Sequence, residues 1–140
     1  MRILVDANVI ISYLLNPRQS SAIVKIFDAV FAGEVTLLFP QALLDEVAIT
    51  VTGKARLRRR IPTDSLNVVI SSLKVLAEAV PRIEEEIPQV TRDPKDDYLL
   101  AYAMVGEADY LVTGDKDLLV LENIDRLKII TPALFARLLS

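Results

Sequence analysis

The sequence predicts an α/β sandwich built on a largely parallel sheet, and three observations lead to that class. Short apolar runs alternate along the chain with longer segments in which apolar residues recur at helical spacing. Acidic residues follow directly after several of these apolar runs. The 140 residues show no repeat, linker or low-complexity segment, so we expect a single domain over residues 1–140.

Two predicted elements open the chain. Residues 2–5 form a short apolar run that is typical of a buried parallel strand, with Asp6 at its carboxyl end. Ser20 or Ser21 can cap a helix whose apolar residues recur at helical spacing until Gly33 ends it.

A second strand and a second long helix follow directly. We expect the strand over residues 35–39, and Pro40 suits the first turn of the helix after it. Glu46 lies one position outside the apolar stripe of that helix. Its carboxylate is therefore expected near the carboxyl end of the strand.

The middle of the chain gives weaker patterns. Thr63 or Asp64 can cap a helix that continues to Leu76. Residues 80–90 then combine apolar, acidic and proline residues, and we interpret them as a strand.

A strong helix start lies at Asp93. The pattern places Asp93 at the N-cap, Pro94 in the first position and Asp96 at capping-box spacing, and the helix runs to Gly106. Because this geometry already accounts for Asp93 and Asp96, we prefer a structural role for both. Asp97, in the same first turn, is not explained by capping.

The last third repeats the pattern of a strand closed by an acid. We expect a strand over residues 110–112 that leads to Asp115, then a short helix near residues 118–121. A last strand over residues 128–130 precedes a terminal helix that opens at Pro132.

Composition restricts the chemistry mainly through two missing residue types. The chain has no His and no Cys. Disulfides, thiolate nucleophiles, Ser-His-Asp triads and the usual zinc sites are therefore excluded, since each requires one of these side chains. Carboxylates suit hard cations that prefer oxygen ligands, such as Mg²⁺ or Mn²⁺.

Hydropathy and charge limit the location and the partners. Hydrophobic residues make up 52% of the chain, but the longest apolar runs are far shorter than the ~20 residues of a membrane span. The first residues lack the apolar stretch of a signal peptide, so we expect a cytoplasmic protein. A net charge of −3 argues against holding nucleic acid by overall charge, although a local basic patch can still bind it.

Four carboxylates are expected near one edge of the sheet. Asp6 and Asp115 follow strands, and Glu46 and Asp97 lie on helices that begin close to the same edge, where parallel sheets place their ligands. Two unit charges about 5 Å apart repel by roughly 3 kcal/mol at an effective dielectric near 20. Converging carboxylates therefore require raised pKa values or a bound cation, which would supply an activated water for attack on a phosphodiester.

Each acid also has a structural interpretation. Asp6 and Asn8 could cap the helix that follows the first strand, and we give this equal weight to a ligand role. Glu46 taken alone is more often a solvated helix residue. Asp115 and Asp117 could be turn and cap residues of the short helix after them.

The order of several short motifs resembles that of the PIN-domain nucleases. The motifs are Val5-Asp6-Ala7-Asn8, Glu46 early in the second long helix, Arg92-Asp93-Pro94-Lys95-Asp96-Asp97, and Leu111-Val112-Thr113-Gly114-Asp115-Lys116-Asp117-Leu118-Leu119. The resemblance spans Met1 to Ser140. Within the family, the chain is most similar to the VapC-like toxin components of prokaryotic toxin–antitoxin pairs.

The resemblance implies a three-layer α/β/α sandwich and a Mg²⁺- or Mn²⁺-dependent endoribonuclease. The acids carried over are Asp6, Glu46, Asp97 and Asp115, with Asp117 as an extra metal ligand and with Asn8 and Thr113 as supporting polar residues. In the Asp96–Asp97 doublet we choose Asp97, because it directly precedes the Tyr-Leu-Leu-Ala run, as the family's helix acid does. The resemblance further implies RNA as substrate, an antitoxin partner and a homodimer.

One dense basic stretch could contact RNA. It consists of Lys54, Arg56, Arg58, Arg59 and Arg60. A rim that binds phosphates and a solvated helix surface have about equal weight for such a charge run.

Two other functions compete with a nuclease. A catalytically silent PIN-like module would bind RNA or a protein without cleaving. A receiver- or phosphatase-like domain also gathers acids and Mg²⁺ at strand ends, but Asp6-Ala7-Asn8 lacks the second acid of the phosphatase pattern.

Overall fold

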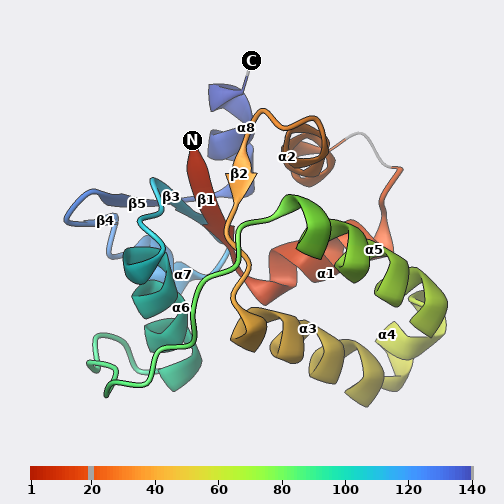
Figure 1. Cartoon of the computed structure of the whole chain (residues 1–140), viewed down its shortest axis with the longest axis horizontal. Helices are drawn as coiled ribbons and strands as arrows, with labels where there is room; N and C mark the ends of the chain where they lie inside the picture. The colour runs from red at the N-terminus through yellow and green to blue at the C-terminus, as the bar shows by residue number, and fades with distance from the viewer. Residues whose placement is uncertain (19–20, 140) are drawn as a thin grey trace.

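The computed structural model describes residues 1–18 and 21–139, which form a sheet of five strands in the order β2-β1-β3-β5-β4 (Figure 1). The strands are β1 (Arg2–Val5), β2 (Thr36–Leu37), β3 (Tyr110–Val112), β4 (Asn123–Ile124) and β5 (Leu127–Ile130). Among them β4 alone runs antiparallel to its neighbour. The predicted α/β class with a largely parallel sheet is confirmed.

Helices lie on both faces of this sheet, which gives the expected three-layer α/β/α arrangement. In the described part of the chain they are α1 (Ala7–Leu15), α2 (Ala22–Phe31), α3 (Gln41–Gly53), α4 (Ala55–Arg60), α5 (Thr63–Leu76), α6 (Pro94–Val105), α7 (Lys116–Leu119) and α8 (Pro132–Leu138). Helix α2 packs against α8 and α1 packs against α3, while α6 contacts β3 and α7 contacts β5. None of these helices is long and apolar enough to cross a membrane.

The core explains why the strand sequences are continuous apolar runs. Ile3, Leu4 and Val5 of β1 have no exposed surface, and neither do Leu111 and Val112 of β3. A parallel strand covered on both faces can place no residue in water, so every position favours an apolar side chain. The register pairs Val5 with Val112, and this pairing brings the residues after both strands to the same edge.

The helix ends in the first part of the chain follow the predicted capping. The Asp6 carboxylate accepts a hydrogen bond from the Val9 amide at 2.9 Å, and Ser21 caps α2 through the Val24 amide at 3.2 Å. The alternative cap, Ser20, lies outside the described residues. Gly33 follows α2 with φ of +77°, a conformation that glycine adopts without steric cost.

The second strand is shorter than predicted, because another segment takes over part of its pairing. β2 covers only Thr36–Leu37 instead of residues 35–39. Beyond it, the Phe39 amide donates to the Glu78 carbonyl at 2.8 Å, and the Glu78 amide donates to the Leu37 carbonyl at 2.8 Å. The chain after α5 therefore extends the sheet by one bridge outside β2.

Two predictions for the middle of the chain are wrong. The strand predicted over residues 80–90 is not formed, and Pro81 and Pro88 give a physical reason, since proline has no amide hydrogen for a ladder. The helix before them is present, but its N-cap position is Pro62 and no side chain caps it. Thr63 is already the first helical residue.

Candidate active site

The carboxyl ends of β1 and β3 bring Asp6 and Asp115 together through one hydroxyl. The Thr113 hydroxyl donates to one oxygen of Asp6 and accepts a hydrogen bond from the Asp115 amide at 3.0 Å. Thr113 is fully buried, so water does not compete for these contacts. The predicted position of both acids at this edge of the sheet is what the structure shows.

Both acids also cap helices, so the structural interpretation of each is correct as far as it goes. Asp6 caps α1, and Asp115 accepts from the Asp117 amide at 2.9 Å at the start of α7. Burial raises the pKa of Asp6, and the charge of Asp115 raises it further against the opposing hydrogen bonds from Thr113 and Val9. Helix capping accounts for each acid separately, but it does not explain why two mutually repelling carboxylates lie close together.

Asp96, rather than Asp97, is the acid of α6 that faces Asp115. Burial, together with the charge and hydrogen bonding of Asp115, raises the pKa of Asp96 to about 7. The capping box predicted for Asp96 is not formed, because the Asp93 amide donates to the Thr91 hydroxyl at 3.2 Å. The N-cap itself is confirmed, since Asp93 accepts from the Lys95 amide at 2.9 Å.

Asp97 points to the segment that precedes α6, so our choice of Asp97 as the inward acid is not supported by its placement. One oxygen of Asp97 accepts from the Thr91 amide at 2.7 Å, from the Val90 amide at 3.0 Å and from the Thr91 hydroxyl at 3.0 Å. Successive residues of an α-helix point in directions about 100° apart, which fits the different surroundings of Asp96 and Asp97.

The sequence contains Asp96 but gave no reason to choose it. Its spacing from Asp93 matched a capping box, and that match explained the residue without any ligand role. The sequence pattern did not reveal that the Thr91 hydroxyl, rather than the Asp96 carboxylate, accepts the hydrogen bond of the Asp93 amide.

Glu46 approaches the same edge from α3. Its side chain is half-buried, and this burial raises its pKa. The charge of Lys95 lowers the pKa, whereas the charges of Asp6 and Asp93 raise it. Glu46 is therefore within electrostatic reach of Asp6 and of the first turn of α6.

We call Asp6, Glu46, Asp96 and Asp115 the acidic cluster. Mutual repulsion contributes to the raised pKa values of Asp6, Glu46 and Asp96. The donors are carboxylates, the ligands that Mg²⁺ and Mn²⁺ prefer, and a cation would offset the repulsion. Within residues 1–18 and 21–139, no three acids are grouped closely enough to enclose an ion.

The remaining predicted polar residues lie at the margin of the acidic cluster. Asn8 is exposed and lines a hollow of about 350 Å³ beside Asp6 and Asp115. Asp117, predicted as an extra ligand, accepts a hydrogen bond from the Arg92 guanidinium at 2.9 Å. One of its oxygens is therefore already engaged.

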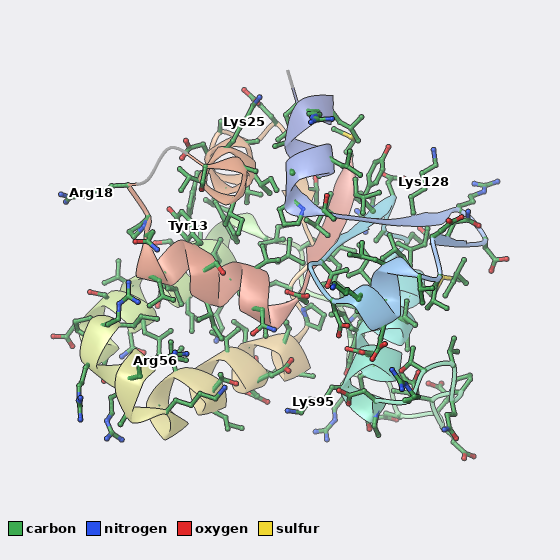
Figure 2. The ribbon with its side chains drawn as sticks, turned by 180° about the vertical axis from the view of Figure 1, so that it is seen from behind. Tyr13, Arg18, Lys25, Arg56, Lys95 and Lys128 are labelled. Carbon is green, nitrogen blue, oxygen red and sulfur yellow. The ribbon has the colours of Figure 1, made fainter. Side chains whose placement is uncertain are left out.

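The basic stretch lies away from the acidic cluster. Its five residues, Lys54, Arg56, Arg58, Arg59 and Arg60, are all exposed, on α4 or just before it. Figure 2 shows Arg56 and Lys95 near opposite ends of α3. Glu46 lies in the second turn of this helix, which spans Gln41–Gly53. From Glu46 to Gly53, α3 rises by about 10 Å. A nucleic-acid strand that contacts both the acidic cluster and the basic stretch would therefore have to run along α3.

Comparisons with known proteins agree with this architecture. The crystal structure of VapBC2 from Rickettsia felis, bound to a DNA fragment from their promoter, is similar with a TM-score of 0.62. The two sequences are 13% identical, over 94% of this chain and 98% of that chain, so the likeness concerns the fold. No curated protein matches the sequence. The family model described as PIN domain matches residues 2–117, and the chain therefore belongs to the PIN domain family.

Proposed function

We propose that the chain is a divalent-metal-dependent endoribonuclease. PIN domains are generally nucleases, which supports the reaction class. The observation that supports the proposal is the acidic cluster near the carboxyl edge of the parallel sheet, in which Asp6 follows β1, Asp115 precedes α7, and Glu46 and Asp96 lie on α3 and α6. Such an edge is where α/β sheets bind their ligands.

The acids divide into two roles in this proposal. Asp6, Asp96 and Asp115 would hold the cation, and the Thr113 hydroxyl fixes the orientation of Asp6. Mg²⁺ or Mn²⁺, when bound, would supply a water of lowered pKa and neutralise charge on the phosphate. Glu46 stands apart on α3, and its raised pKa suits it to take the proton of the attacking water.

RNA binding would involve a second surface. The basic stretch of α4 is exposed and can contact phosphates on either side of the cleaved bond. Such contacts position the strand without reading its sequence, and they offset the negative charge of the acidic cluster.

A toxin role extends the same proposal. The likeness to VapBC2 supports the toxin of a toxin–antitoxin pair with an antitoxin as partner. The homodimer is a further part of the proposal and rests on the resemblance of the sequence to the family alone. Co-expression with a small protein encoded next to this chain tests the pairing. We expect the two to purify together and the cleavage of RNA to stop.

The experiment that tests the nuclease uses purified chain and mixed RNAs with Mn²⁺, with Mg²⁺ or with EDTA. We expect cleavage with metal only, and its loss in Asp6→Asn and Asp115→Asn. Asp125→Asn is the matched control, because Asp125 is an exposed acid in the β4–β5 turn. Cleavage that survives both cluster substitutions, or that continues in EDTA, would contradict the proposal.

One observation favours a second candidate, a PIN-like module that binds without cleaving. No three acids of the described chain are arranged to enclose an ion. Melting temperatures with and without Mn²⁺ separate the two functions, since a ligand that binds the folded state stabilises it. A rise that Asp6→Asn abolishes supports the nuclease, whereas RNA binding without any rise supports the silent module.

A further inference from the structure

A groove opens beside the acidic cluster, between α3 and α6. Its volume of about 560 Å³ lies within the usual range for small-ligand pockets, and its surface is mostly apolar. Figure 1 shows the first turns of α3 and α6 near each other, and residues of both line the groove. Glu46 belongs to its wall, so the groove adjoins the acidic cluster directly.

An exposed aromatic ring forms part of that wall. Tyr98 of α6 is 49% exposed, and Ile49 of α3 is 70% exposed. Tyr102, one turn after Tyr98, is buried, and its hydroxyl accepts a hydrogen bond from the Ile83 amide at 3.4 Å. The chain thus exposes an aromatic and an aliphatic surface that its own core does not cover.

Two cations stand at the same groove. Lys95 and Arg82 line it, both are exposed, and neither forms an ion pair with the described residues. Of the acids in the wall, Asp45 accepts a hydrogen bond from Gln41 at 2.9 Å, and Glu46 belongs to the acidic cluster. An anionic ligand with a flat apolar part would match this combination of charge and surface.

We propose that this groove, which we call the base groove, binds the nucleotide next to the cleaved bond of a single-stranded RNA. The base lies against Tyr98, and the flanking phosphates contact Lys95 and Arg82. A paired base stays in its stack and cannot enter, so the groove favours unpaired RNA. The inference rests on the proposed function and adds the place where the substrate is held.

Binding of RNA tests the aromatic contact without any need for cleavage. The probe is a fluorescein-labelled oligouridine of about six nucleotides, measured on the full chain in an Asp6→Asn background that prevents cleavage. We expect Tyr98→Ala to weaken binding by roughly fivefold to a hundredfold, as loss of one base–aromatic stack does. Tyr98→Phe keeps the ring and should bind like the parent.

A matched control lies on the same helix. Met104 is 39% exposed on α6 but does not line the groove. Met104→Ala should leave RNA binding unchanged. Equal binding by Tyr98→Ala and Met104→Ala would overturn the base groove while leaving the nuclease proposal intact.

Salt dependence tests the two cations. Lys95→Gln and Arg82→Gln should each reduce the slope of log Kd against log salt by about 0.7, the value for one phosphate contact with a single strand. Lys128→Gln, on the exposed side of β5, is the control and should not change the slope (Figure 2). Unchanged slopes in both groove variants would overturn the phosphate contacts.

Cross-linking, which reports where the RNA lies on the protein, separates this inference from the proposed function. Irradiation of the same probe carrying 5-iodouracil should cross-link Tyr98, because that base couples to an aromatic ring against which it stacks. Cross-links confined to α4, or no binding of the probe at all, would overturn the base groove. So would a homodimer that Tyr98→Ala dissociates, since a second copy would then occupy the groove. Cleavage that survives Asp6→Asn contradicts the nuclease instead, and the cross-link can still be measured.

Discussion

Asp96 and Asp97 are neighbours in the first turn of α6, and their carboxylates face opposite kinds of surroundings. Asp96 lies against Asp115, among other acids. Asp97 lies against the segment before the helix, where three donors from Val90 and Thr91 point at one of its oxygens. Both side chains are largely buried.

The surroundings move the two pKa values in opposite directions. Burial and the nearby Asp115 raise the pKa of Asp96 to about 7. Burial also acts to raise the pKa of Asp97, but the hydrogen bonds from Thr91 and Val90 together lower it below 3.8. On the Asp96 side of the turn, negative charges accumulate that a cation could offset. On the Asp97 side, the carboxylate accepts hydrogen bonds that hold the preceding segment in place.

This difference teaches that residue type does not assign a role within an acidic doublet. The segment before α6 has no regular secondary structure, and Asp97 fastens its end to the helix. The position of that segment in turn keeps the Asp93 amide paired with Thr91, so that Asp96 can face Asp115. Variants at the two positions should therefore differ in activity, in stability and in pH dependence.

Activity should separate the two residues most strongly. Asp96→Asn should reduce metal-dependent RNA cleavage by roughly a hundredfold or more, because it removes a charge from the acidic cluster. Asp97→Asn should retain most activity, since the amide oxygen of Asn can still accept from Val90 and Thr91. Initial rates at saturating Mn²⁺ measure both, and equal losses would show that the two acids do not differ in role.

Stability should respond in the reverse order. Asp97→Ala leaves the Val90 and Thr91 amides without their acceptor, so we expect the melting temperature to fall by several degrees and residues 81–93 to become more sensitive to proteases. Asp96→Ala in EDTA removes repulsion from Asp115 and should be neutral or stabilising. Thermal unfolding and limited proteolysis of both variants check this, and a lower melting temperature for Asp96→Ala alone would break the comparison.

The pH dependence of stability should carry opposite signs. Because the pKa of Asp96 rises from 3.8 to about 7, the folded chain binds more protons than the unfolded chain between these values. The stability linked to that proton is present below pH 3.8 and is lost as pH rises through about 7. For Asp97, whose pKa is lowered, stability is present above pH 3.8 and is lost as pH falls below that value.

Urea midpoints measured in EDTA across this pH range test the signs. Asp96→Asn should flatten the decline of stability toward neutral pH, and Asp97→Asn should flatten the loss in acid. If Asp96→Asn leaves the curve near neutral pH unchanged, Asp96 is not the group whose proton links stability to pH there.

The smallest effect is expected at the surface. Arg92 donates to Asp117 at 2.9 Å and is the second fastening of the segment before α6, but its side chain is 86% exposed. Surface ion pairs contribute less than about 1 kcal/mol, so Arg92→Gln should barely change the free energy of unfolding. Chemical denaturation measures it, and a loss as large as that of Asp97→Ala would show that Arg92 fastens the segment as strongly as Asp97 does.

Local patterns were sufficient for much of the fold and for part of the acidic cluster. Asp6 and Asp115 could be predicted because each closes a buried apolar strand, and parallel strands end at one edge. Asp96 could not, because its local environment in the sequence matched a capping box, and only Thr91 in three dimensions occupies that place. The strand predicted over residues 80–90 failed for a related reason, since strands exist only where a partner offers its ladder.

The amino-acid sequence alone is enough to predict the class of fold, the family, the absence of His and Cys, and the acidic residues available for chemistry. The fold class follows from periods of two to four residues and the missing residue types from composition, whereas the family follows from the order of the motifs and the family model. The tertiary structure alone decided that Asp96 faces Asp115, that Thr113 joins Asp6 to Asp115, and that Tyr98 borders a groove beside Glu46. Each of these is a contact between residues far apart in the chain, and its geometry depends on how whole elements pack.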